Sequence, residues 1–256
     1  MPEILSNIFN TMLLTNFELF LAFFGAFLLG TSKAGIKGVG VIIVTIMAIV
    51  FGGKPSTGVL IPMMILADIF AVIYYHRHTQ WKYLVKLLPT MVIGVLLGVW
   101  FGNDISDAIF KQLMAVLILG IVVLMVYMDL KKSKDIPQNR FFSNSMGLLA
   151  GFTSMIGNLA GSFSNIYFLA MRLPKNEFIG TAAWLFFIIN VFKLPFHIFV
   201  WKTVSKESLM INTLLIPGII LGFYAGVKFV KLINNEAYRK FILIVTAIGA
   251  VIILFK

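Results

Sequence analysis

Three lysines lie within or beside long apolar stretches, where a charged side chain needs a specific reason to be present. Lys33 and Lys37 are four residues apart in a glycine-rich break, and Lys193 lies inside the apolar run from Phe178 to Phe199. A cation at membrane depth costs at least about 2.5–3.5 kcal/mol on insertion scales, so it usually faces a partner, a substrate or water. We expect these lysines to contact an anion, with extension to the membrane interface as an equal alternative for Lys37.

The break around Lys33, from Gly30 to Gly40, has a counterpart from Gly151 to Ser162. Each ends in a helix N-terminus, whose free N–H groups and positive dipole end attract anions. Non-helical backbone at membrane depth is tolerated only where it lines a cavity or is buried in protein. The alternative is that the glycines only permit close helix packing. The candidate substrate-binding residues are Thr31, Ser32, Lys33, Gly35, Lys37, Gly38, Thr153, Ser154, Gly157, Asn158 and Ser162, with Trp184, Asn190 and Lys193 along the pathway.

Acidic residues within the apolar segments are few, namely Glu18 and Asp68. A cation transporter is expected to carry more carboxylates around its site. Asp68 has two readings of equal weight. It is a proton carrier, or it is the counter-ion of Lys33 or Lys193.

The composition places these residues in a membrane protein. The chain is 60% hydrophobic and 12% charged, with a mean hydropathy of +0.98. A soluble domain needs more polar surface to cover its core. Apolar runs such as Val59–Tyr75 and Gln112–Met128 are of membrane-spanning length. We expect an all-α polytopic fold in contact with the lipid bilayer.

Several other function classes are disfavoured by the residues present. The chain has no cysteine, which excludes disulfides and thiolate metal sites, and its three histidines lie near loop ends. No nucleophile–base group or phosphate-binding motif is visible, so neither an enzyme nor a cofactor or metal is expected. The net charge of +11 comes from Lys and Arg in loops, which suits membrane orientation and anionic headgroups better than nucleic acid.

The chain is predicted to be a duplication. Apolar segments fall near 12–31, 38–52, 57–75, 83–102 and 107–130, and again near 141–154, 158–172, 178–199, 208–230 and 237–255. At a constant offset of 122 positions, Gly58 matches Gly180 and Asp68 matches Asn190. Residues 1–130 therefore form the first expected repeat, 131–140 a basic linker and 141–256 the second repeat.

The two repeats are expected to be inverted. If the first two segments of each repeat enter and leave on the same side of the membrane, most Lys and Arg residues of the chain fall in loops on the inside. Parallel repeats would instead divide these residues almost evenly between the two sides. This places the linker in the cytoplasm and both termini outside. The segment from Phe17 to Leu29 lacks the positive start of a secretory signal, so we interpret it as the first membrane segment.

The second segment of each repeat is too short to cross a bilayer alone. Val39–Phe51 makes roughly 20 Å of helix, against a hydrocarbon core of about 30 Å. We expect a hairpin of short or broken helices in each repeat, with the two tips meeting near the middle of the membrane, followed by three full membrane helices. Inverted repeats with broken helices are a recurring transporter design.

The break sequences resemble those of the sulfite exporter TauE/SafE family over nearly the whole chain. The resemblance rests on residues 31–40, 56–58 and 67–75 in the first repeat, and on 150–158, 173–175 and 178–184 in the second. It implies export or uptake of sulfite, sulfonates such as sulfoacetate or related organic anions across the plasma membrane. It does not fix which anion is carried.

We therefore expect a secondary transporter of a small anion that works by alternating access, with Asp68 as the candidate for proton coupling. The alternatives are an anion channel, which needs a continuous pore, and a membrane subunit that does not transport. The oligomeric state and the direction of transport stay open.

Overall fold

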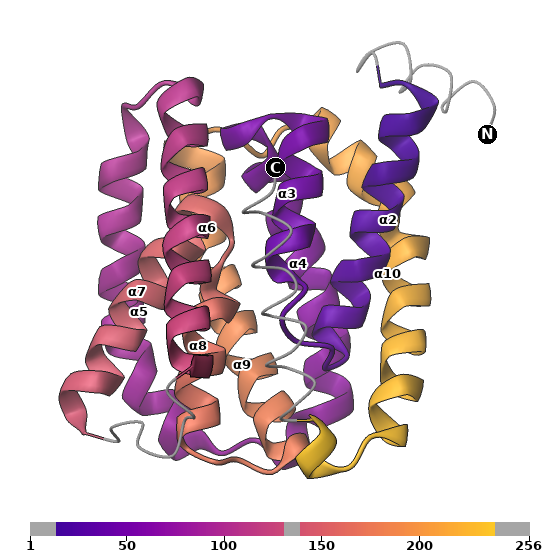
Figure 1. Cartoon of the computed structure of the whole chain (residues 1–256). Helices are drawn as coiled ribbons and strands as arrows, with labels where there is room; N and C mark the ends of the chain where they lie inside the picture. Colours follow the sequence, from indigo (N-terminus) through magenta and orange to yellow (C-terminus); the bar gives the residue numbers. More distant parts are fainter. Residues whose placement is uncertain (1–13, 131–138, 239–256) are drawn as a thin grey trace.

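The structure, a computed structural model, describes residues 14–130 and 139–238, and within these ranges it is a helical bundle without strands (Figure 1). The first half, residues 14–130, contains α2 (Asn16–Lys33), α3 (Gly40–Phe51), α4 (Gly53–Tyr75), the 3-10 turn η1 (His76–His78), α5 (Trp81–Asn103) and α6 (Asp107–Leu130). The second half, residues 139–238, contains α7 (Arg140–Gly157), α8 (Ala160–Ala170), α9 (Lys175–Pro195), the π-helical turn η2 (Phe196–Val200) and α10 (Lys206–Leu232).

Helices α4 and α9 are equivalent in the two halves and run antiparallel. Near the end of α4, Thr79 Oγ1 donates a hydrogen bond to the carbonyl of Gly180, close to the start of α9, at 3.3 Å. At the opposite end, the backbone of Thr203, just after η2, packs directly on Gly58 near the start of α4. Because equivalent helices run in opposite directions, the halves are inverted relative to each other, as the sequence predicts.

The first helix of each half packs on a helix of the other half. Helix α2 lies along α10, and α7 lies along α5. Glycines bring the backbones together: a Cβ added at Gly222 would lie 2.8 Å from the Phe27 carbonyl carbon, and one at Gly151 would lie 2.8 Å from that of Met91. Lipid supplies no hydrophobic force between helices, so close backbone contact is what holds such pairs together.

Two short helices make the centre of the bundle irregular. Helix α3 has 12 residues and α8 has 11, so each is less than about 20 Å long and falls short of the hydrocarbon thickness. The pairs α2–α3 and α7–α8 form two hairpins, and the chain turns back inside the bundle in each (Figure 1). This matches the predicted hairpins.

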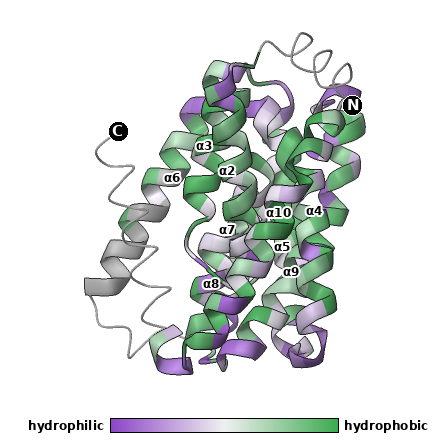
Figure 2. Ribbon diagram, turned by 90° about the vertical axis from the view of Figure 1, so that its right-hand side faces the viewer, coloured by the Kyte–Doolittle hydropathy of each residue, from purple (hydrophilic) through white to green (hydrophobic). Residues whose placement is uncertain are grey.

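The outer surface of the bundle is apolar. Four described helices are long and apolar enough to span a membrane by length and composition, at Gly53–His78, Trp81–Asn103, Lys175–Val200 and Lys206–Leu232. Large side chains such as Trp100, Phe141, Phe199 and Leu232 are exposed. Hydrophilic residues gather toward the two ends of the bundle (Figure 2). The protein is a multi-pass membrane protein.

The predicted helix ends near the hairpins are wrong by a few residues. Thr31, Ser32 and Lys33 form the last turn of α2, and Thr153 lies inside α7, where a non-helical break was expected. The threonine hydroxyls fit a helix because each donates to a carbonyl about one turn back, to Leu28 at 2.8 Å and to Leu149 at 2.7 Å.

Two predicted segments fall largely outside the described residues. These are the basic linker, of which positions 131–138 are not described, and the last apolar segment near 237–255.

Candidate functional site

The first tip, residues 34–39, joins α2 to α3. Its sharp turn uses Gly35 at φ +125°, a left-handed conformation that favours glycine. Two tyrosine hydroxyls hold the tip in place: that of Tyr75 donates to the Ala34 carbonyl at 2.9 Å, and that of Tyr238 donates to the Gly35 carbonyl at 2.6 Å. The tip is therefore fixed from the ends of two other segments.

The second tip, Asn158 and Leu159, joins α7 to α8. Asn158 has φ +55°, in the left-handed region that asparagine tolerates better than most residues. Its side-chain oxygen accepts a hydrogen bond from Lys193 Nζ at 2.8 Å, and Lys193 also donates to the Ser154 carbonyl at 2.8 Å. A cation at this place suits the free carbonyls and negative dipole end of α7.

Between the two tips lies a cavity of about 70 Å³. Its polar lining comes from Ser32, Lys33, Lys37, Ser154, Asn158, Ser162, Asn165 and Asn190. Its apolar and glycine lining comes from Leu29, Gly38, Gly40, Val41, Ile43, Met64, Leu159, Ala160, Gly161 and Phe186. About 10–15 Å³ of such space is enough for one water molecule, so the cavity has room for an ion of few heavy atoms.

An ion pair lies beside the cavity. Lys33 Nζ is 2.7 Å from Asp68 Oδ1, and Asn190 Nδ2 donates to Asp68 Oδ2 at 2.6 Å. Asp68 is fully buried, whereas Lys33 is 7% exposed and lines the cavity. The carboxylate is thus held between an ammonium of the first half and an amide of the second. Of the two counter-ion pairings that the sequence left open, the one with Lys33 is present.

Lys37 is buried and donates to the Ser32 carbonyl, in the last turn of α2, at 3.1 Å. It therefore satisfies the C-terminal end of α2 much as Lys193 satisfies that of α7. The alternative that Lys37 extends to the membrane interface is not the conformation observed.

The electrostatics of the cavity favour a negative ligand. Lys33 and Lys37 line it, Lys193 lies behind Asn158, and among the described residues of this cluster the one carboxylate is Asp68, already paired with Lys33. The first residues of α3 and of α8 also line the cavity, which brings two positive helix ends to it. Such an arrangement can hold an anion without a metal or cofactor.

The family of the chain is decided by comparison with known sequences. The pattern of the sulfite exporter TauE/SafE family matches residues 20–253, which is nearly the whole chain. The chain belongs to the sulfite exporter TauE/SafE family. No curated protein and no solved structure is a match for it.

Membership in the TauE/SafE family makes the protein a membrane transporter of the sulfite-like anion class. The cavity between the tips is consistent with that class, because its charged lining is cationic. Within the described residues, no group of three or more His, Asp or Glu side chains could hold a metal ion.

The structure brings many of the predicted residues of this TauE/SafE chain to the cavity, but not all. Those that line it are Ser32, Lys33, Lys37, Gly38, Ser154, Asn158, Ser162 and Asn190. Four others are close in sequence to lining residues but do not line the cavity, namely Thr31, Gly35, Thr153 and Gly157. Lys193 lies behind Asn158. Trp184 faces elsewhere, since its ring packs on Trp81 at 5.3 Å and does not line the cavity.

The predicted site omits several residues that line the cavity, among them Phe186 and Asn165. Phe186 could have been found from helical spacing, because it lies four residues before Asn190 and seven before Lys193, on one face of α9. Asn165 lies three residues after Ser162 in α8 and could have been found in the same way. Its Nδ2 atom is on the side of Gly161, which also lines the cavity.

Proposed function

We propose that this TauE/SafE protein is a secondary transporter that moves sulfite, a sulfonate such as sulfoacetate or a related small organic anion across the plasma membrane. The observation that carries the proposal is the meeting of two lysines and two helix N-termini at one small cavity between inverted halves. Each of these features favours negative charge, and no described carboxylate of the cluster is free to oppose it.

Alternating access is the mechanism that this architecture supports best. In transporters built from inverted repeats, the binding site lies near the membrane midplane where broken helices meet, and one part rocks against another around it. Here the cavity takes its lining from both hairpins, from α4 and from α9, so it lies where the two halves meet.

Proton coupling would act through Asp68. The Asp68 carboxylate pairs with Lys33 and would therefore compete with a substrate anion for that ammonium. A proton on Asp68 would remove that competition and free the ammonium for the anion. Protonation of Asp68 and binding of the anion would then favour each other. The anion and the proton would therefore be carried across the membrane in the same direction.

The orientation follows from the Lys and Arg distribution, with residues 131–140 as a cytoplasmic linker between repeats 1–130 and 141–256 and with both termini outside. Cysteines at His78 and Ser106 test it, since the chain has no native cysteine and both positions are exposed at opposite ends of the bundle. An impermeant thiol reagent applied to whole cells should label Ser106→Cys and spare His78→Cys. The opposite pattern would reverse the assignment.

Transport is tested with purified protein in proteoliposomes. We expect saturable uptake of sulfite or a small sulfonate, and counterflow when the vesicles are preloaded with the same anion. Lys33→Gln should abolish uptake, while the exposed Lys228→Gln serves as the matched control and should leave it unchanged.

The same assay separates the alternatives. Flux that does not saturate and shows no counterflow would indicate an anion channel. An absence of any sulfite, sulfonate or carboxylate flux from folded protein would indicate a subunit that does not transport, and would overturn the proposal.

A further inference from the structure

Phe186 contacts the two cavity lysines with its ring. Lys33 Nζ lies 4.8 Å from the centre of the ring and Lys37 Nζ lies 5.6 Å from it. Both distances are within the range of cation–π attraction, in which the negative face of an aromatic ring draws an ammonium group. The ring comes from the second half of the bundle and both lysines from the first.

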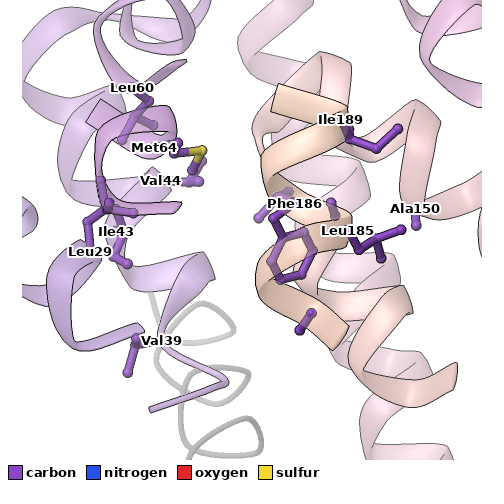
Figure 3. Packing of buried hydrophobic residues seen from close by; sticks show 14 of the residues in the cluster. Leu29, Val39, Ile43, Val44, Leu60, Met64, Ala150, Leu185, Phe186 and Ile189 are labelled. Atoms are coloured by element: carbon purple, nitrogen blue, oxygen red, sulfur yellow. The ribbon is translucent and has the colours of Figure 1, made fainter. Parts of the chain in front are cut away.

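The position of the ring makes it part of the cavity wall. Phe186 is buried and lines the cavity. Figure 3 shows it projecting from α9 toward the side on which Leu29 and Ile43 lie. An aliphatic side chain at this place would fill the space equally well. The presence of an aromatic ring beside two cations therefore needs a separate reason.

The repeat supplies a comparison within the same molecule. Met64 is the equivalent of Phe186, because it lies four residues before Asp68 as Phe186 lies four residues before Asn190, and it too lines the cavity. The positions equivalent to Lys33 and Lys37 are Met155 and Leu159, which carry no charge. The aromatic ring therefore occurs in the half that faces the lysines, and its counterpart in the other half is not aromatic.

The two ammoniums need such a neighbour. Like charges close together repel, and that repulsion is large in a buried site. Asp68 offsets the charge of Lys33, while the hydrogen-bond partner of Lys37 is the neutral carbonyl of Ser32. The ring face of Phe186 attracts both ammoniums at once and places them at the same wall.

We propose that Phe186 is a positioning residue for anion binding, whose ring holds Lys33 and Lys37 together at the cavity. This inference rests on the proposed function, since it assumes that the two lysines bind the anion. Removing the π face while keeping the bulk should weaken anion binding by roughly 3- to 30-fold, the range expected for a cation–π contact between partly and fully desolvated.

The test uses the full-length protein in proteoliposomes with sulfite as the probe. Phe186 is replaced by phenylalanines carrying one, two and three ring fluorines, which weaken the negative face with little change in volume, and by Leu and Tyr. We expect the KM for sulfite to rise stepwise with fluorination, to rise most for Phe186→Leu and to stay near the native value for Phe186→Tyr. The maximum rate and the melting temperature should not change along the fluorine series.

Phe187→Leu is the matched control, because Phe187 packs edge-to-face on Trp184 at 6.0 Å and does not line the cavity. It should leave the KM unchanged. A KM that is the same across the fluorine series would overturn the inference while leaving the proposed function intact.

A second measurement does not depend on transport. The ammonium ¹H–¹⁵N resonances of Lys33 and Lys37, recorded on anion-free protein in detergent, should shift in Phe186→Leu because the ring current is lost, and should not shift in Phe187→Leu. Unshifted resonances in Phe186→Leu would also overturn the inference. If native protein transports no anion in proteoliposomes, the proposed function fails, and the resonances alone decide whether the ring positions the lysines.

Discussion

Asn190 donates a hydrogen bond to Asp68 at 2.6 Å, and the two residues hold the same position in the two halves of the bundle. Residues related by an approximate two-fold axis can touch only where that axis passes between them. The axis therefore runs beside the cavity, with Lys33 next to it. An amide on one side and an acid on the other avoids the repulsion that two facing carboxylates would suffer.

Asp68→Asn should both destabilise the protein and stop transport. The change leaves the Lys33 ammonium buried without its counter-ion, and breaking a buried pair in this way costs about 3–5 kcal/mol. The loss is measured by thermal unfolding in detergent.

The double variant Lys33→Met with Asp68→Leu should recover most of that stability and still not transport, because it removes both charges together. If the double variant is as unstable as Asp68→Asn, the ion pair is not the source of the loss.

Lys193→Met should destabilise the protein more than Lys37→Met. Lys193 donates two hydrogen bonds at the end of α7 and Lys37 donates one at the end of α2. Hydrogen bonds from charged donors contribute about 1.5–3 kcal/mol each, so the difference should be of that size. Unfolding midpoints of the two variants in the same detergent provide the comparison, and equal midpoints would contradict it.

Gly222→Ala should weaken the contact between α2 and α10. The added methyl would lie 2.8 Å from the Phe27 carbonyl carbon, where only backbone could move aside, and overpacking of this kind costs about 1–3 kcal/mol. Gly120→Ala in α6 is the matched control, because no atom of the described residues lies within 4 Å of its added Cβ. The control should be neutral or slightly stabilising, since alanine favours helix. A similar loss in both variants would contradict the prediction, because the methyl at position 120 has no described neighbour to clash with.

Tyr75→Phe combined with Tyr238→Phe should loosen the first tip. Each change removes a hydroxyl that holds a tip carbonyl, worth about 0.5–1.5 kcal/mol per hydrogen bond. A cysteine at Ser162 in the cavity should then react faster with a small thiol reagent added from the side on which α4 ends. Tyr224→Phe, on an exposed position of α10, is the control. An unchanged labelling rate would mean that the hydroxyls do not restrain the tip.

Much of the fold is predictable because its signals are local. The lengths of the apolar segments identify both hairpins, and the repeat with the Lys and Arg distribution gives the inversion that α4 and α9 confirm. The lysines are found because charge inside an apolar run is costly wherever it occurs. These arguments require no knowledge of which helices touch.

The remaining features depend on contacts between distant residues. Nothing in the spacing of Gly222 indicates that its partner is Phe27. Helical spacing can place Phe186 on the face of α9 that carries Asn190, but its contact with two lysines of the other half is visible only in the structure. Trp184 is predicted to lie along the pathway, yet the rotation of α9 directs its ring toward Trp81.

The first helix of each half packs against a helix of the other half, and this has a consequence for how the protein is made. Helix α2 leaves the ribosome long before α10, the helix against which its glycine surface packs. Until then its small-residue face lies in lipid or against a temporary partner in the insertion machinery, as unassembled parts of a large protein generally do. Neither half expressed alone can complete its packing, so synthesis of the last helices is the step that commits the whole chain to its native assembly.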